Sequence, residues 1–218
     1  MAIDRDIRQR VRYYLNRSKG FAGVVGDTDV MQAFLETAAT MPSPRVLELG
    51  TKRLYTERTS MHRELVPHAS EFLGADILDG DDVDIVTDVH KLSDTVGKES
   101  FDIIISCSSF EHFKYPHLAA HQIMATLNVG GCLFIQTHQS FPLHSAPYDY
   151  FRYSREALAG LFGTKMGFEV IATDYEFPSR IFSKESAQTR FLPSFLNVRL
   201  FGRKTAVTPD DYIYELDG

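Results

Sequence analysis

Hydrophobic residues follow two different spacings along the chain. Some segments carry apolar side chains at helical spacing, whereas others are short and almost continuously apolar. The first pattern is typical of helices with one buried face, and the second of strands covered on both faces. The predicted helices are 3–17, a helix capped by Asp27 or Thr28 that ends near residue 39, 60–67, 116–127 and 155–163. The predicted strands are 45–49, 71–75, 84–87, 101–107, 132–138, 168–173 and 198–201.

This order of elements predicts an α/β fold. Strands that alternate with helices form right-handed crossovers, and so a parallel sheet with helices on both faces. Two predicted strands follow a single helix near the end, where the alternation stops. Because no linker rich in Gly, Ser or Pro divides the chain, we expect one domain over 1–218. Within it, 1–40 is expected to be a helical cover, 45–203 the core sheet and 204–218 a tail.

Composition narrows the classes of partner. The formal net charge of −6 gives no general attraction for nucleic acid or anionic lipid, so neither is expected as a partner. No run approaches the roughly 18 apolar residues of a membrane span, and the first residues lack the apolar core of a signal peptide, which predicts a cytoplasmic protein. Cys107 and Cys132 fall at opposite ends of predicted strands, too far apart to pair, so reduced core thiols are expected.

The stretch Val46-Leu47-Glu48-Leu49-Gly50 organises the rest of the chain. It reads as a buried strand that ends at a glycine, where the backbone must turn sharply or approach a ligand. Open α/β sheets hold their ligands at this carboxyl edge. Polar residues follow other predicted strands in the same way: Asp76 and Asp88 the second and third, and Ser106, Glu111 and His112 the fourth.

Between residues 45 and 173 these motifs resemble those of class I S-adenosylmethionine-dependent methyltransferases of the small-molecule type. The resemblance implies a Rossmann-like, doubly wound, seven-stranded and mostly parallel sheet whose last strand is antiparallel. It implies S-adenosylmethionine as the cofactor. It also implies methyl transfer to a hydroxyl or amine of a small molecule, with a sugar as one candidate.

The resemblance assigns roles to several of these residues. Asp76 matches the acid that accepts hydrogen bonds from both ribose hydroxyls, and Asp88-Val89 matches the pair that contacts adenine. The residues expected to bind the cofactor are Glu48, Gly50, Thr51, Lys52, Asp76, Asp88, Val89 and Ser106. Alternatively, Asp76 and Asp88 are turn or helix-cap residues, and Gly50 is a turn residue without a ligand.

The first loop departs from the family, because no glycine follows Gly50 until Gly74. We expect Lys52 or Arg53 to point into the site and to neutralise the carboxylate of the cofactor; the alternative leaves both in water. The departure also keeps a second function open, a catalytically silent methyltransferase-like binding or scaffold protein. A dehydrogenase ranks last, because the loop lacks G-x-G-x-x-G.

Histidines near the end of the fourth and fifth strands are the candidates for catalysis. His112 or His138 could serve as a general base for a hydroxyl nucleophile, since imidazole titrates near neutrality, or either could be a hydrogen-bonded structural residue. No metal is expected, because no Cys-x-x-Cys spacing is present in the sequence and a catalytic metal site would also need an open coordination position.

The aromatic-rich loop 139–153 supplies the candidates for substrate binding, namely His144, Tyr148 and Arg152. As an alternative, Arg152 pairs with Asp149 inside the loop. The later segment 175–197 mixes Arg, Phe and Pro residues, which suggests a lid or a dimer contact. A homodimer is therefore among the expected partners.

Overall fold

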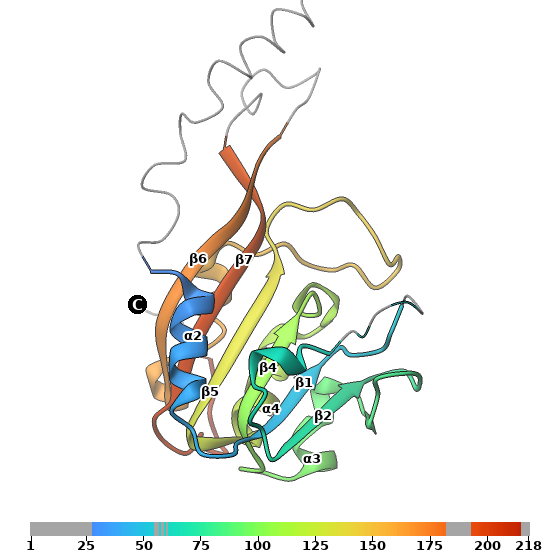
Figure 1. The fold of residues 1–218 in the computed structure, drawn as a ribbon. Helices are drawn as coiled ribbons and strands as arrows, with labels where there is room; N and C mark the ends of the chain where they lie inside the picture. Colours follow the sequence, from blue (N-terminus) through green and yellow to red (C-terminus); the bar gives the residue numbers. More distant parts are fainter. Residues whose placement is uncertain (1–27, 55–56, 58, 60, 182–192, 215–218) are drawn as a thin grey trace, which may run out of the picture.

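The computed structural model describes residues 28–54, 57, 59, 61–181 and 193–214, so the predicted helix 3–17 lies outside the described residues. The core is a seven-stranded sheet with the order β3-β2-β1-β4-β5-β7-β6 (Figure 1). Its strands are β1 (Arg45–Leu49), β2 (Glu71–Asp76), β3 (Ile85–Val86), β4 (Phe101–Cys107), β5 (Leu127–His138), β6 (Phe168–Arg180) and β7 (Pro193–Lys204). β1 to β5 pair in parallel, and β7 is antiparallel to both of its neighbours. The predicted sheet, including its antiparallel last strand, is confirmed.

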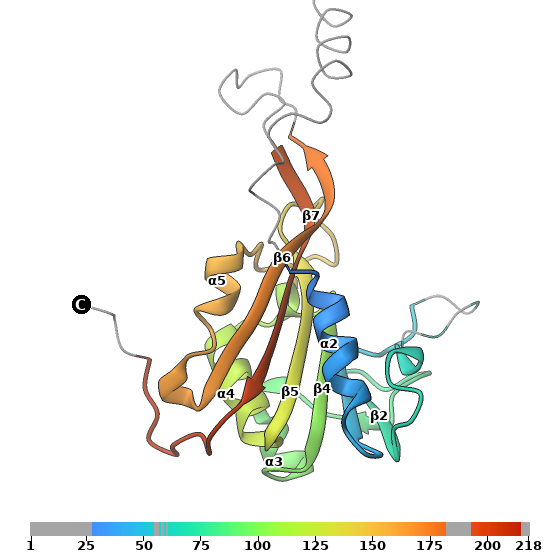
Figure 2. The ribbon, with the colours of Figure 1, turned by 60° about the vertical axis from the view of Figure 1, so that its left-hand side comes forward.

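Helices cover the two faces of the sheet unequally. The helix α2 (Val30–Ala39) lies on one face, whereas α3 (Leu92–Val96), α4 (Pro116–Thr126) and α5 (Arg155–Ala159) lie on the other (Figure 2). Alternate residues of the central strands serve the two layers: Ile103 and Ile105 of β4 pack towards α2, and Ile104 packs towards α4. This is why β4 is apolar almost throughout, as predicted for a strand buried on both faces.

Asp29 caps α2, rather than Asp27 or Thr28 as predicted. Its carboxylate accepts hydrogen bonds from the backbone N–H of Met31 at 3.0 Å and of Gln32 at 3.3 Å, two donors that a helix leaves unpaired at its start. The buried face of the helix packs its Phe34 ring 5.0 Å from that of Phe134, centroid to centroid. The predicted end of the helix near residue 39 is confirmed.

The predicted helix 60–67 is wrong. Of the described residues there, only Arg63–Leu65 form a single 3-10 turn, η1. His62, just before the turn, donates its backbone N–H to the side chain of Glu48 and not into a helix. Pro67 disfavours helical backbone at Val66, whose φ of −136° is extended. The connection from β1 to β2 is therefore mostly loop.

Other element boundaries differ at the ends. β5 begins at Leu127 rather than at residue 132 as predicted: Leu127 pairs with Phe101, and the register then shifts so that Cys132 pairs with Ile103. Residues 128–131 thus form an irregularity inside the strand, and Gly130 takes a φ of +86° there. α5 ends at Ala159 rather than at residue 163, because Gly160 follows it.

The last two strands are much longer than predicted. Pairing of β5 with β7 ends at His138 and Asn197, but β6 and β7 remain paired as far as Arg180 and Pro193. The two strands therefore project beyond the rest of the sheet (Figure 1). Most of the described part of the segment 175–197, expected to be a lid or a dimer contact, is this paired ribbon, and 182–192 lie outside the described residues.

Cys107 and Cys132 are both free thiols, as predicted. Their strand partners differ by several residues, since Cys132 pairs with Ile103 and Cys107 with Gln136. Burial raises the pKa of Cys132 to about 12. Among the described helices, none has the length and apolar character that crossing a membrane requires.

Candidate functional site

The carboxyl ends of β1 to β5 meet at one edge of the sheet, and the sequence-predicted site residues gather there. Gly50 makes the turn after β1 with a φ of +80°, and a Cβ on it would collide with the hydroxyl of Ser109. Its backbone N–H donates to the carbonyl of Ala75 at 2.8 Å, which joins the ends of β1 and β2. A glycine is thus required here by the turn itself.

Asp76 holds the loop that follows Gly50. One carboxylate oxygen accepts the backbone N–H of Lys52 at 3.0 Å, and the other accepts that of Leu78 at 3.0 Å. An ionised carboxylate can accept about four hydrogen bonds, so each oxygen retains capacity for a further donor. The side chain is half-buried at the end of β2, where a ligand at the sheet edge can reach it.

Asp88 and Val89 lie beside Asp76, because the backbone N–H of Thr87 donates to the carbonyl of Asp76 at 2.8 Å. Asp88 caps the short 3-10 helix η2 (Val89–Lys91) and accepts from both the backbone and the ring of His90, at 3.0 and 2.6 Å. Burial opposes the charge of Asp88, but these two hydrogen bonds hold its pKa below the usual value. Val89 is buried in the core.

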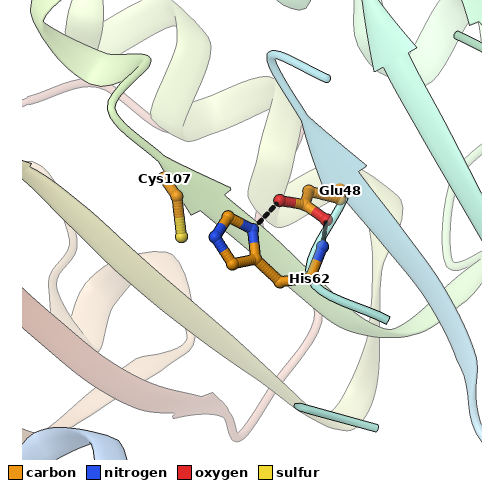
Figure 3. A group of neighbouring side chains, drawn as sticks. All are labelled: Glu48, His62 and Cys107. Atoms are coloured by element: carbon orange, nitrogen blue, oxygen red, sulfur yellow. Dashed lines mark hydrogen bonds and ion pairs between the residues drawn. The ribbon is translucent and has the colours of Figure 1, made fainter. Parts of the chain in front are cut away.

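Glu48 is almost fully buried and bound to His62. Its two oxygens accept the backbone N–H of His62 at 2.7 Å and the ring Nδ1 at 2.5 Å. The imidazole lies between this carboxylate and the thiol of Cys107 (Figure 3). The hydrogen bond that the ring of His62 donates to Glu48 raises the pKa of His62, whereas burial raises the pKa of Cys107 and keeps it a thiol. The acid of the first motif is therefore paired within the protein.

Two hydroxyls at this edge lack a partner. Thr51, which follows Gly50, and Ser106, near the end of β4, are fully buried, and neither side-chain oxygen forms a hydrogen bond with the part of the chain that the structure describes. Ser106 pairs with Leu49 in the sheet, so both hydroxyls flank the end of β1. Buried hydroxyls without partners are costly, and a bound ligand is one way to satisfy them.

The basic residues of the first loop turn towards the connection between β2 and β3. Arg53 donates to both carboxylate oxygens of Asp82, at 2.9 and 3.1 Å, and its backbone N–H donates to the carbonyl of Asp81. The alkyl part of Lys52 lies along Gly80 in the same connection. Arg53 is thus held by acids of this chain and is not directed at the end of β1. Of the two residues predicted as alternatives to point into the site, Lys52 or Arg53, Arg53 does not do so.

On the other half of the edge, Glu111 forms the centre of a histidine cluster. It lies in the 3-10 turn η3 (Phe110–His112) after β4 and is fully buried. One oxygen accepts the hydroxyl of Thr137 at 2.7 Å. The other, Oε1, lies 3.0 Å from Nε2 of His138, 3.8 Å from that of His112 and 3.9 Å from that of His144.

The second nitrogen of each ring, Nδ1, faces an oxygen that can only accept. Nδ1 of His112 lies 2.7 Å from the carbonyl of Tyr148, and that of His144 lies 3.1 Å from the carbonyl of Pro142. Nδ1 of His138 lies 3.0 Å from Oδ1 of Asn197 on β7. Each Nδ1 therefore carries a proton, and in a neutral ring Nε2 then carries the lone pair.

Glu111 and His138 stabilise each other's charged forms within the cluster. Burial disfavours the charged form of each group, but the opposite charge of its neighbour lowers the pKa of Glu111 and raises that of His138. Oε1 of Glu111 and Nε2 of His138 form an ion pair at 3.0 Å, but Oε1 has no well-aligned hydrogen bond within the described residues.

The loop 139–153 leaves the end of β5 and returns to it, since the backbone N–H of Tyr153 donates to the carbonyl of His138 at 2.9 Å (Figure 1). The backbone N–H groups of Tyr150 and Phe151 donate to the carbonyl of Glu111, which fastens the loop to the end of β4. Arg152 binds both oxygens of Asp149, at 2.6 and 2.8 Å, as the alternative reading of the loop predicted. Arg152 also holds the pKa of Asp149 well below its usual range.

The three residues expected to bind substrate are therefore placed differently. His144 joins the cluster, Arg152 stabilises the loop, and Tyr148 contributes a carbonyl while its side chain is exposed.

Sequence reasoning missed Glu111, Asn197 and His62 as members of these sites. Glu111 had a signal, because an acid directly follows a buried strand and precedes His112. Asn197 lies far along the chain and reaches His138 only through the pairing of β5 with β7. His62 lies in a polar stretch without periodicity, so nothing in the sequence connects it to Glu48.

The family and structure comparisons agree on the type of fold. A family model described as a methyltransferase domain matches residues 26–173. No curated protein matches the sequence significantly.

Several solved structures are similar over nearly their whole length. One is a Bacillus halodurans protein that is described tentatively as a methyltransferase. The two structures match with a TM-score of 0.57 at 14% sequence identity, over 81% of this chain and 99% of the Bacillus chain. The 1,6-didemethyltoxoflavin-N1-methyltransferase of Burkholderia thailandensis, solved with its substrate and S-adenosylhomocysteine, has a TM-score of 0.55 at 14% identity, with 94% and 92% coverage. A Haloferax volcanii complex with the Trm112 methyltransferase activator has a TM-score of 0.53 at 18% identity, with 94% and 100% coverage.

Proposed function

Because the chain belongs to the methyltransferase domain family, we propose that it transfers the methyl group of S-adenosylmethionine to a hydroxyl or amine of a small molecule. The family and enzyme class expected from the sequence are confirmed by this membership. The acceptor is a proposal, and a sugar hydroxyl remains one candidate for it. The Burkholderia neighbour acts on a small molecule, which supports an acceptor of that size.

The residues at the ends of β1, β2 and β4 fit this cofactor. The two oxygens of Asp76 retain acceptor capacity for two ribose hydroxyls, and the unpaired hydroxyls of Thr51 and Ser106 can form hydrogen bonds to polar groups of a ligand. When bound, S-adenosylmethionine supplies a methyl group that its sulfonium has already activated. The chain must then orient the acceptor and exclude water.

The observation that carries the proposal for the acceptor is the state of His112. Its Nδ1 proton is held by the carbonyl of Tyr148 at 2.7 Å, which leaves the lone pair on Nε2, and its side chain is 26% exposed. Nε2 can therefore take the proton that a hydroxyl or amine loses as its new bond to carbon forms. His138 is a poorer base, because Glu111 and Asn197 face its two nitrogens and it is buried. We therefore assign the role of general base to His112 rather than His138.

A catalytically silent protein is the second candidate, and two observations favour it. Glu48 of the first motif is bound by His62 at both oxygens, and Arg53 is bound by Asp82. Neither side chain is left to hold the amino acid part of a cofactor in this arrangement. Such a protein would bind the cofactor weakly or not at all.

Two measurements separate these candidates. Calorimetry with S-adenosylhomocysteine measures occupancy of the cofactor site, and transfer of a labelled methyl group to a panel of sugars, phenols and amines measures the reaction. We expect saturable binding of one molecule per chain, and transfer that stops in His112→Ala while binding persists. Absence of binding up to about millimolar concentration would favour the silent protein. If the cofactor product binds but no methyl group is transferred to any acceptor tested, the proposed class of acceptor is wrong and the proposed cofactor stands.

A further inference from the structure

We propose that Glu111, His138 and His144 bind a divalent transition-metal ion of the zinc class, at the carboxyl end of β4 and β5. One ligand atom from each residue lies within 4.8 Å of the other two. Two imidazoles and one carboxylate are a ligand set found in catalytic zinc sites, which leave a further coordination position open. The sequence spacing argued against a metal, but the three residues come from a turn, a strand end and a loop that only the fold brings together.

The distances suit a metal ion. Ligands with bonds of about 2.0 Å in a tetrahedral site are roughly 3.3 Å apart. Oε1 of Glu111 lies 3.0 Å from Nε2 of His138 and 3.9 Å from Nε2 of His144, which brackets that separation. The imidazole planes of His138 and His144 meet at 73°, so the two rings approach the common point from different directions.

The hydrogen bonds around the cluster direct its lone pairs to one point. Asn197 and the carbonyl of Pro142 hold the Nδ1 protons of His138 and His144, so the Nε2 atoms, which face Glu111, are the ones that can bind a metal ion in place of a proton. Metal-binding histidines almost always have their other nitrogen held in this way. Three groups that offer only electrons repel one another unless a cation or a proton lies between them.

The carboxylate is arranged for the same purpose. Oε2 of Glu111 is occupied by the hydroxyl of Thr137 at 2.7 Å, whereas Oε1 is buried, has no well-aligned hydrogen bond within the described residues and lies 3.0 Å from Nε2 of His138. Its charge needs a positive partner, which a protonated His138 or a metal ion in place of that proton can supply. Imidazole nitrogen favours zinc and its neighbours over magnesium or calcium, which prefer all-oxygen sites.

The metal site does not depend on the proposed methyl transfer, and the two can fail separately. His144 is 28% exposed, so an ion has a route from solvent to the buried carboxylate. Nε2 of His112 lies 3.8 Å from the same Glu111 oxygen and would stand beside the ion as a proton acceptor.

Metal binding by the full chain tests the proposal without any assay of activity. Protein treated with a chelator is titrated with Zn²⁺ by calorimetry, and with Co²⁺ by visible absorption, which reports its coordination. We expect one ion per chain. His144→Ala should weaken binding by about 100-fold or more, because loss of an outer partner alone costs 10- to 100-fold. Since His144 lies in a surface loop, this variant should fold, and thermal unfolding of the metal-free form checks it.

Control variants decide between this site and others. His117→Ala removes an exposed histidine of α4 and should leave binding unchanged, whereas Glu111→Gln, which keeps the shape of the side chain, should weaken it as His144→Ala does. The proposal is overturned if no saturable binding occurs, or if His117→Ala and His144→Ala have equal effects. Loss of binding in His62→Ala but not in His144→Ala would overturn it too, because the ion would then lie among Glu48, His62 and Cys107.

Discussion

Glu48 and His62 are joined at both carboxylate oxygens, one by the backbone N–H of His62 at 2.7 Å and the other by its ring at 2.5 Å. The two contacts differ in how they depend on pH. The backbone contact is present whenever Glu48 is ionised, whereas the ring contact is strongest when the imidazole carries a proton. Fourteen positions separate the two residues, so this pair fixes the loop between β1 and β2.

The first prediction concerns stability against pH. The hydrogen bond that the ring of His62 donates to Glu48 raises the pKa of His62 in the folded protein, and the charge of Glu64 adds to this, whereas Cys107 remains neutral. A raised folded pKa means that the contribution is fully present below the unfolded value of about 6.5 and is lost as pH rises through the folded value. The difference in unfolding free energy between the natural protein and His62→Gln should therefore shrink from pH 6 to pH 9, as urea denaturation would measure. An equal difference at both values would contradict the raised pKa.

The second prediction compares a buried ion pair with an exposed one. Arg199 of β7 binds both oxygens of Asp174 on β6, at 2.8 and 2.6 Å, and the same carboxylate accepts the backbone N–H of Val30 at the start of α2. Asp174→Ala leaves a buried guanidinium with weaker partners and should lower the unfolding free energy by about 3–5 kcal/mol. The matched control is Glu71→Ala, which breaks an exposed pair with Arg45 and should cost less than about 1 kcal/mol. Similar losses in the two variants would show that burial does not decide the energy.

How far the sequence predicts this fold depends on the burial of each element. The bounds of β1 and β4 are as predicted to the residue, because strands covered on both faces are apolar throughout. The outer halves of β6 and β7 were missed, because charged residues such as Glu176 interrupt the apolar pattern there. The side chain of Glu176 forms an ion pair at 3.3 Å with Arg199 of the neighbouring strand, so the interrupting charge has a partner across the sheet.

The position of a candidate residue was predictable where that residue lies at the end of a strand. Asp76 and His138 are the last residues of β2 and β5, and the fold brings them to one edge of the sheet, whereas their roles stay predictions. Contacts between distant loops left no pattern in the sequence, as with His62 beside Glu48. The role of Arg53 was misjudged for the same reason, because Asp82, its partner, lies across a different connection.

The third prediction tests Asp76 as a ligand of the cofactor. Asp76→Ala removes an acceptor for the ribose hydroxyls and should weaken binding of S-adenosylhomocysteine by on the order of 1–3 kcal/mol, as calorimetry would measure. The variant also releases the backbone of Lys52, so a control is needed for loosening of the loop. Asp84→Ala provides it, since the side chain of Asp84 accepts the backbone N–H of Gly74 in the same region. Equal weakening in both variants would exclude a specific role for Asp76.

The last prediction separates the two histidines that sequence analysis could not distinguish. His112 has one nitrogen held by the carbonyl of Tyr148 and the other unprotonated, whereas both nitrogens of His138 face buried partners. His112→Gln should therefore slow methyl transfer by about 100-fold or more, while affinity for S-adenosylhomocysteine and the unfolding temperature change little. The pH dependence of the transfer rate should also differ between His112→Gln and the natural protein.

His138→Gln should act differently, because it leaves Glu111 buried without its charged neighbour. Its main effect should be a lower free energy of unfolding, on the order of 1–3 kcal/mol for a buried charged group that loses its partner. Turnover per folded molecule measured in both variants decides the assignment. If His138→Gln folds normally and abolishes transfer while His112→Gln remains active with an unchanged pH profile, the base is His138, and the ordering of the two nitrogens by Tyr148 and Asn197 has no catalytic meaning.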